Sequence, residues 1–78
     1  IVSISIGCKI GEGNLAQELQ KIETSENDIE IGCYPWFKSG VIGTNVVIRS
    51  LNKESCSRAA NKVKDFIKTF GETPKIIK

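Results

Sequence analysis

The segment between residues 52 and 71 constrains the fold more than any other part of the chain. Its apolar residues follow one another at steps of three and four, which is the spacing along one face of an α-helix. They are Cys56, Ala59, Ala60, Val63, Phe66, Ile67 and Phe70. Asn52 is the expected N-cap and Gly71 the expected C-terminal stop, so the pattern predicts an amphipathic helix of about five turns. A helix with one apolar face must bury that face against a second layer of secondary structure.

That second layer is predicted to be a β-sheet, because four segments have the character of short strands. These segments are residues 1–6, 28–33, 44–51 and 75–78. Pro74 places the last segment at a sheet edge, where proline is tolerated. The residues expected to face the core are Val2, Ile4, Ile6, Leu15, Leu19, Ile22, Ile29, Ile31, Val46, Ile48, Ala59, Ala60, Val63, Phe66, Ile67 and either Ile76 or Ile77.

A shorter helix is predicted between the first two strands, over about residues 15–23. Asn14 is the expected N-cap, and Gln17 stands three residues later, as in a capping box. The resulting order is β-α-β-β-α-β, which is typical of the ferredoxin-like class of α+β folds. We therefore expect a four-stranded antiparallel sheet with both helices on one face.

The length and charge of the chain limit its function. Its 78 residues make one small α+β domain, and the first residue, Ile1, already lies inside a strand pattern in a chain without methionine. We expect a domain excised from a larger multidomain protein, with another domain before Ile1. A balance of 11 basic and 9 acidic residues gives no basic stripe for a nucleic-acid partner. No apolar run is long enough to predict a membrane span.

The three cysteines, Cys8, Cys33 and Cys56, show no metal-binding spacing, and the chain contains no histidine. A zinc site needs about four such ligands, so none is expected. An odd number of thiols is typical of a reducing compartment, which predicts a cytoplasmic protein. Each cysteine is expected to be a small buried residue, because cysteine is among the residues most often found in protein cores.

The stretch Ile31-Gly32-Cys33-Tyr34-Pro35-Trp36-Phe37 holds the only tyrosine and the only tryptophan of the chain. It is expected to end the second strand and to open a loop of about ten residues, with Tyr34–Pro35 a candidate cis peptide bond. Trp36, Phe37, Val41 and Ile42 would form an apolar patch in that loop. Two interpretations are open: the loop folds over the core of the domain, or it docks a neighbouring domain.

Four other kinds of site have partial signals in the sequence. Gly11-Glu12-Gly13 before the first helix could present backbone amides to an anion, which motivates a stand-alone small-ligand-binding regulatory module as the alternative function. Gly40-Val41-Ile42-Gly43 has the spacing of the KH-domain loop, but it is expected to join two strands. An RNA-binding sheet needs several exposed aromatic residues, and only Tyr34 is expected on the open face. An acylphosphatase-like hydrolase would need an arginine where this chain has Lys9.

The Ile31–Phe37 stretch resembles the I-G-S-Y-P-x-[FW] motif of a ferredoxin-like, KH-like domain. That domain lies C-terminal to the molybdopterin-binding-like domain of eukaryotic FAD synthases and of competence/damage-inducible-type proteins. Asn14-Leu15-Ala16 upstream, and Val46–Ser50 and Ala59–Phe70 downstream, are similar to the family as well. Cys33 stands where the family usually has serine, and a thiol is a weaker hydrogen-bonding group than a hydroxyl.

This resemblance implies a parent protein that synthesises FAD, as an FMN adenylyltransferase, or that hydrolyses FAD as a pyrophosphatase. FAD or FMN, ATP and Mg²⁺ are implied for the parent, and no cofactor is implied for this chain. The adenylyl transfer would belong to a separate domain of the PAPS-reductase type. The chain itself is expected to be a non-catalytic accessory domain that packs on the molybdopterin-binding-like domain. The motif and docking residues would be Gly32, Cys33, Tyr34, Pro35, Trp36, Phe37, Val41 and Ile42.

Overall fold

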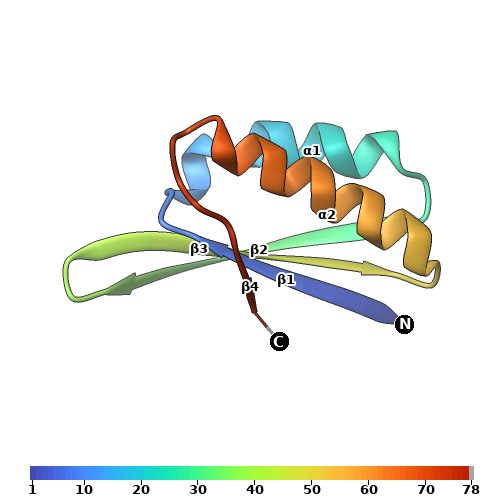
Figure 1. The fold of residues 1–78 in the computed structure, drawn as a ribbon, viewed down its shortest axis with the longest axis horizontal. Coiled ribbons are helices and arrows are strands. Elements are labelled where there is room, and N and C mark those ends of the chain that lie inside the picture. Colours follow the sequence, from blue (N-terminus) through green and yellow to red (C-terminus); the bar gives the residue numbers. More distant parts are fainter. Residues whose placement is uncertain (78) are drawn as a thin grey trace.

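The computed structural model describes residues 1–77 and contains four strands and two α-helices in the order β-α-β-β-α-β (Figure 1). A short 3₁₀ helix, η1, precedes the first α-helix. The bounds in chain order are β1 Val2–Cys8, η1 Glu12–Asn14, α1 Ala16–Ser25, β2 Ile29–Lys38, β3 Val41–Ser50, α2 Lys53–Lys68 and β4 Lys75–Ile77.

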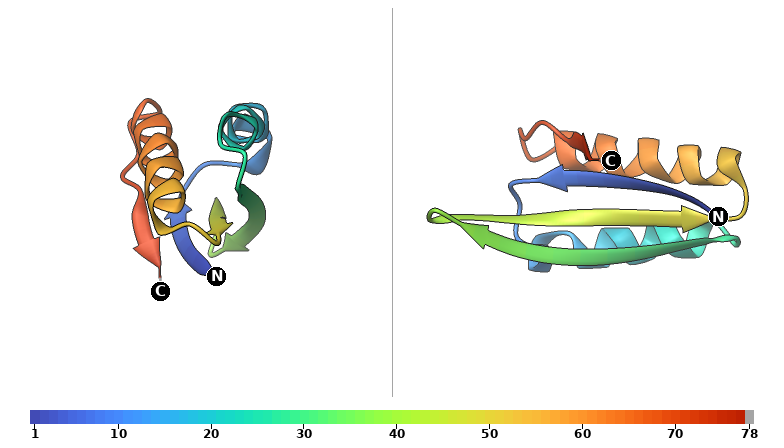
Figure 2. Two further views of the ribbon diagram at one scale, coloured as in Figure 1. Left: turned by 90° about the vertical axis from the view of Figure 1, so that its right-hand side faces the viewer. Right: turned by 90° about the horizontal axis from the view of Figure 1, so that it is seen from below.

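The strands form one antiparallel sheet in the order β2-β3-β1-β4. Both helices lie on the same side of this sheet, which leaves its other face open (Figure 2). The predicted ferredoxin-like fold is therefore confirmed. β4 is an edge strand as expected, although Lys78, the last residue predicted for it, lies outside the described residues.

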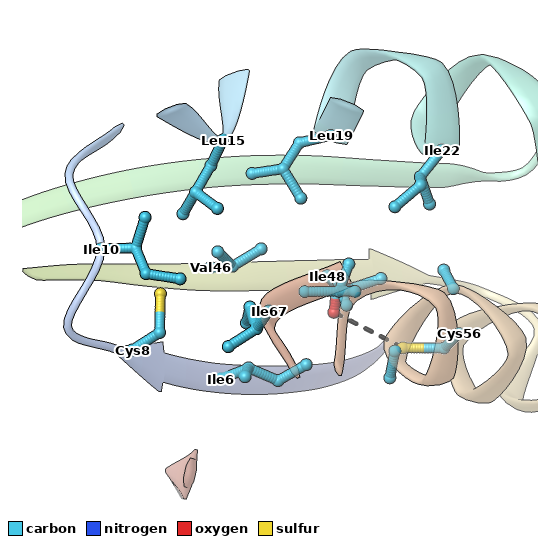
Figure 3. Close-up of a cluster of buried hydrophobic side chains, with 13 residues drawn as sticks. Ile6, Cys8, Ile10, Leu15, Leu19, Ile22, Val46, Ile48, Cys56 and Ile67 are labelled. Carbon is cyan, nitrogen blue, oxygen red and sulfur yellow. Dashed lines mark hydrogen bonds between the residues drawn. The ribbon is translucent and has the colours of Figure 1, made fainter. Parts of the chain in front are cut away.

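The core lies between the sheet and the two helices (Figure 3). Its buried residues are Ile6, Cys8, Ile10, Leu15, Leu19, Ile22, Val46, Ile48, Cys56, Ala59, Ala60, Val63 and Ile67. Most of these were predicted, and Cys8 was expected to be buried, but Ile10 was not predicted. Cys8 was not assigned to a strand, because Gly7 was expected to end the first one. Instead β1 continues through Gly7 to Cys8. In β4, Ile76 pairs with Ile6 and therefore faces the helix side, as one of the two predicted alternatives had it, but it is not buried: Ile76 is 51% exposed and Ile77 is exposed too.

The α2 helix begins and ends where the sequence predicts. The Asn52 side-chain oxygen accepts hydrogen bonds from the backbone N–H groups of Glu54 at 2.9 Å and Ser55 at 3.3 Å. At the other end, Gly71 adopts a φ of +80°, and its N–H donates to the Lys68 carbonyl at 3.0 Å. This left-handed conformation is one that glycine adopts at little cost.

The α1 helix begins differently from the prediction. Asn14 is not its N-cap, because residues 12–14 form η1 and the N–H of Asn14 donates to the Gly11 carbonyl at 3.1 Å. Leu15 occupies the N-cap position of α1 without a side-chain hydrogen bond. The preceding 3₁₀ turn thus leads directly into α1, and Gln17 forms no capping box.

Side chains of α1 form hydrogen bonds to the neighbouring elements. The Glu23 carboxylate accepts a hydrogen bond from the backbone N–H of Ile31 in β2 at 2.8 Å. Just after α1, Glu26 accepts from Lys62 Nζ at 3.0 Å and from Arg58 Nη2 at 3.2 Å, both on α2. The hydrogen bonds from Lys62 and then Arg58 lower the pKa of Glu26. These contacts fix α1 against both the edge strand and α2.

The two asparagines predicted as caps provide a direct test of the helix starts. Asn52→Ala should lower the free energy of unfolding by about 1 kcal/mol, because two N–H groups at the start of α2 lose their acceptor. Asn14→Ala should change it by less than about 0.5 kcal/mol, because the Asn14 side chain caps no helix. Urea denaturation followed by circular dichroism measures both values. Equal losses for the two variants would contradict the capping seen here.

Candidate functional site

The Ile31–Phe37 stretch and the residues after it form a hairpin arm, defined here as residues 35–43 of β2 and β3. The expected ten-residue loop is wrong: β2 runs to Lys38, β3 begins at Val41, and only two residues turn the chain. Those residues, Ser39 and Gly40, have φ angles of 52° and 78°. Positive φ at both central positions is the requirement of the type I′ turn that joins tightly paired strands.

Pro35 is compatible with this long strand because β2 is the outermost strand of the sheet. At that edge a missing N–H removes no bond to a neighbouring strand. The Tyr34–Pro35 peptide bond is not cis, since residues 1–77 contain no cis peptide bond. The expected cis peptide bond is therefore wrong, as is the expected ten-residue loop.

The arm extends beyond the helix layer (Figures 1 and 2). β1 pairs with β3 only as far as Cys8, which lies opposite Thr44. The part of β3 from Val41 to Gly43 pairs with β2 alone. The arm is therefore a two-stranded ribbon whose base is held in the four-stranded sheet.

The predicted docking residues are divided between the two faces of β2 and β3. Alternation from Ile31 and Ile48, which pair on the core side, assigns each residue to a face. The face on the helix side carries Cys33, Pro35, Phe37 and Ile42. The open face carries Gly32, Tyr34, Trp36 and Val41. Gly32, Cys33 and Tyr34 lie in the four-stranded sheet and the other predicted residues in the arm, so the set does not form one patch.

Phe37 and Ile42 form the most exposed apolar pair of the arm. They lie directly opposite each other across the two strands, with exposures of 71% and 57%. They share the face of Val46 and Ile48, which are fully buried under the helices. The apolar stripe of this face therefore continues beyond the cover of the helices. The interpretation that the segment folds back over the core of the domain is wrong for these two residues.

Trp36 is half-buried on the open face and fixed against β3. Its indole Nε1–H donates to Asn45 Oδ1 at 3.0 Å. The ring lies against Gly43, where a Cβ atom would be 2.1 Å from Trp36 Cζ2 and 2.6 Å from the Cys8 carbonyl oxygen. The open face thus has two aromatic residues rather than the expected one, but only Tyr34 is exposed.

The cysteines are poor candidates for nucleophiles. Burial is the main cause that raises the pKa of Cys33, and the Glu12 and Glu23 carboxylates raise it further. Burial also raises the pKa values of Cys8 and Cys56. These two thiols are buried, as expected, and donate to the carbonyls of Thr44 at 3.6 Å and Ile48 at 3.5 Å. Cys33 was expected to be buried too, but it is only half-buried, because it lies in the edge strand β2. A raised pKa leaves little thiolate at neutral pH.

A pocket of about 430 Å³ lies at the base of the arm, beside β1 and β4. It is lined by Gly7, Cys8, Lys9, Trp36, Asn45, Gly71, Glu72, Thr73, Lys75 and Ile77. Apart from Trp36, the sequence did not indicate this site. Its residues come together because β1 pairs with both β3 and β4, which places Gly7 between Asn45 and Lys75. The continued alternation of Ile6, Gly7 and Cys8 was the one sequence signal that β1 reaches this far.

The two glycine motifs lie at a 3₁₀ helix and at a hairpin turn. Gly11 has ordinary extended angles, and a Cβ at Gly13 would have no atom within 4 Å. The segment forms a three-residue 3₁₀ helix, in which the N–H groups of Asn14 and Leu15 donate to the carbonyls of Gly11 and Glu12. Anion binding at Gly11–Gly13 stays a prediction. Gly40–Gly43 spans the hairpin turn and the start of β3, as the strand-joining interpretation expected.

Residues 1–77 contain neither a metal-binding cluster nor a membrane-spanning helix. No group of three or more cysteine, aspartate or glutamate side chains there is arranged to hold a metal ion. Neither α1 nor α2 combines the length and the apolar character needed to cross a membrane.

Comparisons with known proteins bear on both family and fold. The family described as "FAD synthase, middle domain" matches residues 1–71. No curated protein matched the chain. A de novo designed protein, Foldit4, superposes with a TM-score of 0.81 and 18% identity over 96% of this chain and 91% of that one. A second de novo design, LFR1 1 with ferredoxin fold, superposes with a TM-score of 0.55 and 5% identity. That match covers 99% of this chain and 84% of the design. At these identities the two designs support the fold alone.

Proposed function

This chain belongs to the FAD synthase middle-domain family, and from that premise we propose that it is a non-catalytic accessory domain that packs on a neighbouring domain of its parent protein. The neighbour in this proposal is a molybdopterin-binding-like domain. The parent would synthesise or hydrolyse FAD, and FAD or FMN, ATP and Mg²⁺ would act in its other domains. The parent would be cytoplasmic, in keeping with three cysteines that remain free thiols.

The observation that carries this proposal is the exposed pair Phe37 and Ile42 on a preformed arm. Apolar side chains of this size gain most of their binding energy when a partner removes them from water, about 1.5–3 kcal/mol for each fully covered side chain. The tight turn and the fixed Trp36 hold the arm in one conformation, which lowers the entropy cost of docking. A hairpin that extends an apolar stripe beyond its own helices is well suited to a neighbouring domain.

Two properties support a role without catalysis. The three thiols are held in their protonated form by burial, so none is prepared for nucleophilic attack. The chain also has no histidine, the side chain most often used for proton transfer near neutral pH. The proposed contribution of this domain is therefore a surface and not a reacting group.

Hydrogen exchange tests the docking role. The 78-residue chain is compared with a longer chain of the same protein that includes the molybdopterin-binding-like domain. Amide exchange of residues 37–42 should slow at least about tenfold in the longer chain, because a docked arm is shielded from water and opens less often. Amides of α2 should exchange similarly in both chains.

A matched pair of variants makes this test specific. Phe37→Ser combined with Ile42→Ser should abolish the protection of the arm while leaving the fold intact, because both side chains are exposed. Leu51→Ser is the control, since Leu51 is 84% exposed but follows β3 at its end remote from the arm. Unchanged arm exchange in the longer chain, or equal effects of the control, would contradict the proposal.

A further inference from the structure

The pocket at the base of the arm has a chemistry that the docking role does not use. It lies on the open side of the sheet, where β4 pairs with β1 at Gly7. The segment between α2 and β4, residues 69–74, supplies one side of it through Gly71, Glu72 and Thr73. Figure 1 shows this red segment descending from α2 to the sheet edge beside β1. The pocket is thus built from three separate parts of the chain.

Gly7 keeps the pocket open. A Cβ atom at this position would lie 2.7 Å from Ile77 Cδ1 and 3.2 Å from Asn45 Oδ1. A side chain here would therefore displace both neighbours or fill the space between them. The backbone of Gly7 is an ordinary part of β1 and has no positive φ. The only close neighbours of such a Cβ are the side-chain ends of Ile77 and Asn45.

Trp36 gives the pocket a rigid aromatic wall. The hydrogen bond to Asn45 Oδ1 and the contact with Gly43 fix the indole before any ligand arrives. A planar group can pack against such a ring, and the preformed geometry reduces the ordering that binding requires. Ile77 adds an apolar surface to the same lining.

The charged groups of the lining define the rest of the ligand. Lys9 and Lys75 provide two ammonium groups, and Glu72 provides one carboxylate. The lining therefore carries a net charge of about +1, which favours an anion over a neutral ligand. Lysine ammonium groups bind phosphate oxygens as point charges. The Glu72 carboxylate and the Thr73 hydroxyl remain available to accept from a hydroxyl or amine elsewhere on the ligand.

From these features we propose that the pocket binds a small phosphate monoester that carries an aromatic ring. The phosphate lies between Lys9 and Lys75, and the ring packs against Trp36. A volume of about 430 Å³ falls in the range of about 300–1,000 Å³ that small-molecule sites occupy. This proposed small-ligand site differs from Gly11–Gly13, the site that the sequence suggested. The proposal does not depend on the docking role.

Trp36 is the only tryptophan of the chain, so its fluorescence reports directly on the pocket. The 78-residue chain is titrated with phenyl phosphate under tryptophan-selective excitation. Phenyl phosphate should change the emission of Trp36 with a saturable curve in the millimolar range or below. Inorganic phosphate, which lacks the ring, and phenol, which lacks the charge, should each bind at least about tenfold more weakly.

Charge variants identify the site. Lys9→Glu and Lys75→Glu should each weaken phenyl phosphate binding about tenfold or more, and Glu72→Gln should strengthen it. Lys53→Glu makes the same charge change at the opposite end of α2 from Gly71 and should leave binding unchanged. Gly7→Ala should reduce binding by filling the pocket. Circular dichroism shows whether each variant remains folded.

Two results would overturn the proposal. One is a Trp36 emission that does not respond saturably to millimolar phenyl phosphate. The other is equal binding by the wild-type chain and by folded Lys9→Glu and Lys75→Glu variants. Neither result affects the docking role, because arm protection is measured at Phe37 and Ile42, which do not line this pocket.

Discussion

Replacing Ile48 by alanine is expected to cost this domain a large part of its stability, about 2–5 kcal/mol. Ile48 is fully buried in β3 beneath the helices, and its carbonyl accepts the hydrogen bond of the Cys56 thiol (Figure 3). Removing three carbon atoms there loses their burial and leaves a cavity that the close-packed sheet fills only in part. A domain of 78 residues has roughly 4–12 kcal/mol in total. Urea denaturation followed by circular dichroism measures the loss.

Ile76→Ala is the matched control for this substitution. It removes the same atoms from another strand, and Ile76 lies opposite the core residue Ile6. Because Ile76 is half exposed, its truncation should cost less than about 1 kcal/mol. Similar losses for Ile48→Ala and Ile76→Ala would show that the core is not centred beneath the helices on β3.

Gly43→Ala should have the second largest effect, a loss of about 1–3 kcal/mol. The new methyl group would overlap the Trp36 ring and approach the Cys8 carbonyl, which belongs to the backbone of β1 and has little freedom to move. Relief requires Trp36 to leave β3 and to break its hydrogen bond to Asn45. The same denaturation curve gives the loss, and a red-shifted tryptophan emission should accompany it as the indole becomes exposed.

Gly32→Ala shows whether this effect is specific. Gly32 also lies on the open face of the sheet, but a Cβ there would meet only the ring of Tyr34 at 3.1 Å. Tyr34 is exposed and its ring can rotate away, so the change in stability should stay within about 0.5 kcal/mol. If Gly43→Ala were tolerated as well as Gly32→Ala, the packing of Trp36 described here would be wrong.

The ferredoxin-like fold could be predicted because its strongest signals are local. The spacing of the apolar residues in α2, and the Asn52 cap before it, depend only on neighbours along the chain. The alternation of Ile29, Ile31 and Cys33 likewise assigns the core face of β2 without tertiary information. These patterns reflect the geometry of a helix and a strand, so they survive when the rest of the structure is unknown.

The hairpin arm could not be predicted in the same way. A proline would interrupt a central strand, but it is tolerated in an edge strand. Only the strand order reveals that β2, which contains Pro35, lies at the edge. The glycines around it suggested a loop, although only Gly40 serves the turn and Gly43 makes room for Trp36. The pocket is harder still to predict, because the pairing of β4 with β1 is what places Lys75 in the same lining as Lys9.

The hydrogen bond between Glu23 and Ile31 has a consequence for how this domain meets other chains. Alternate residues of an edge strand direct their N–H groups outward, and Ile31 and Pro35 belong to the same alternate set. Glu23 already occupies the first of these positions, and proline has no donor at the second. A foreign strand that aligned with β2 would therefore find its backbone ladder broken twice within five residues. At these two positions of β2, contact with a partner is left to side chains, which select it by shape and chemistry.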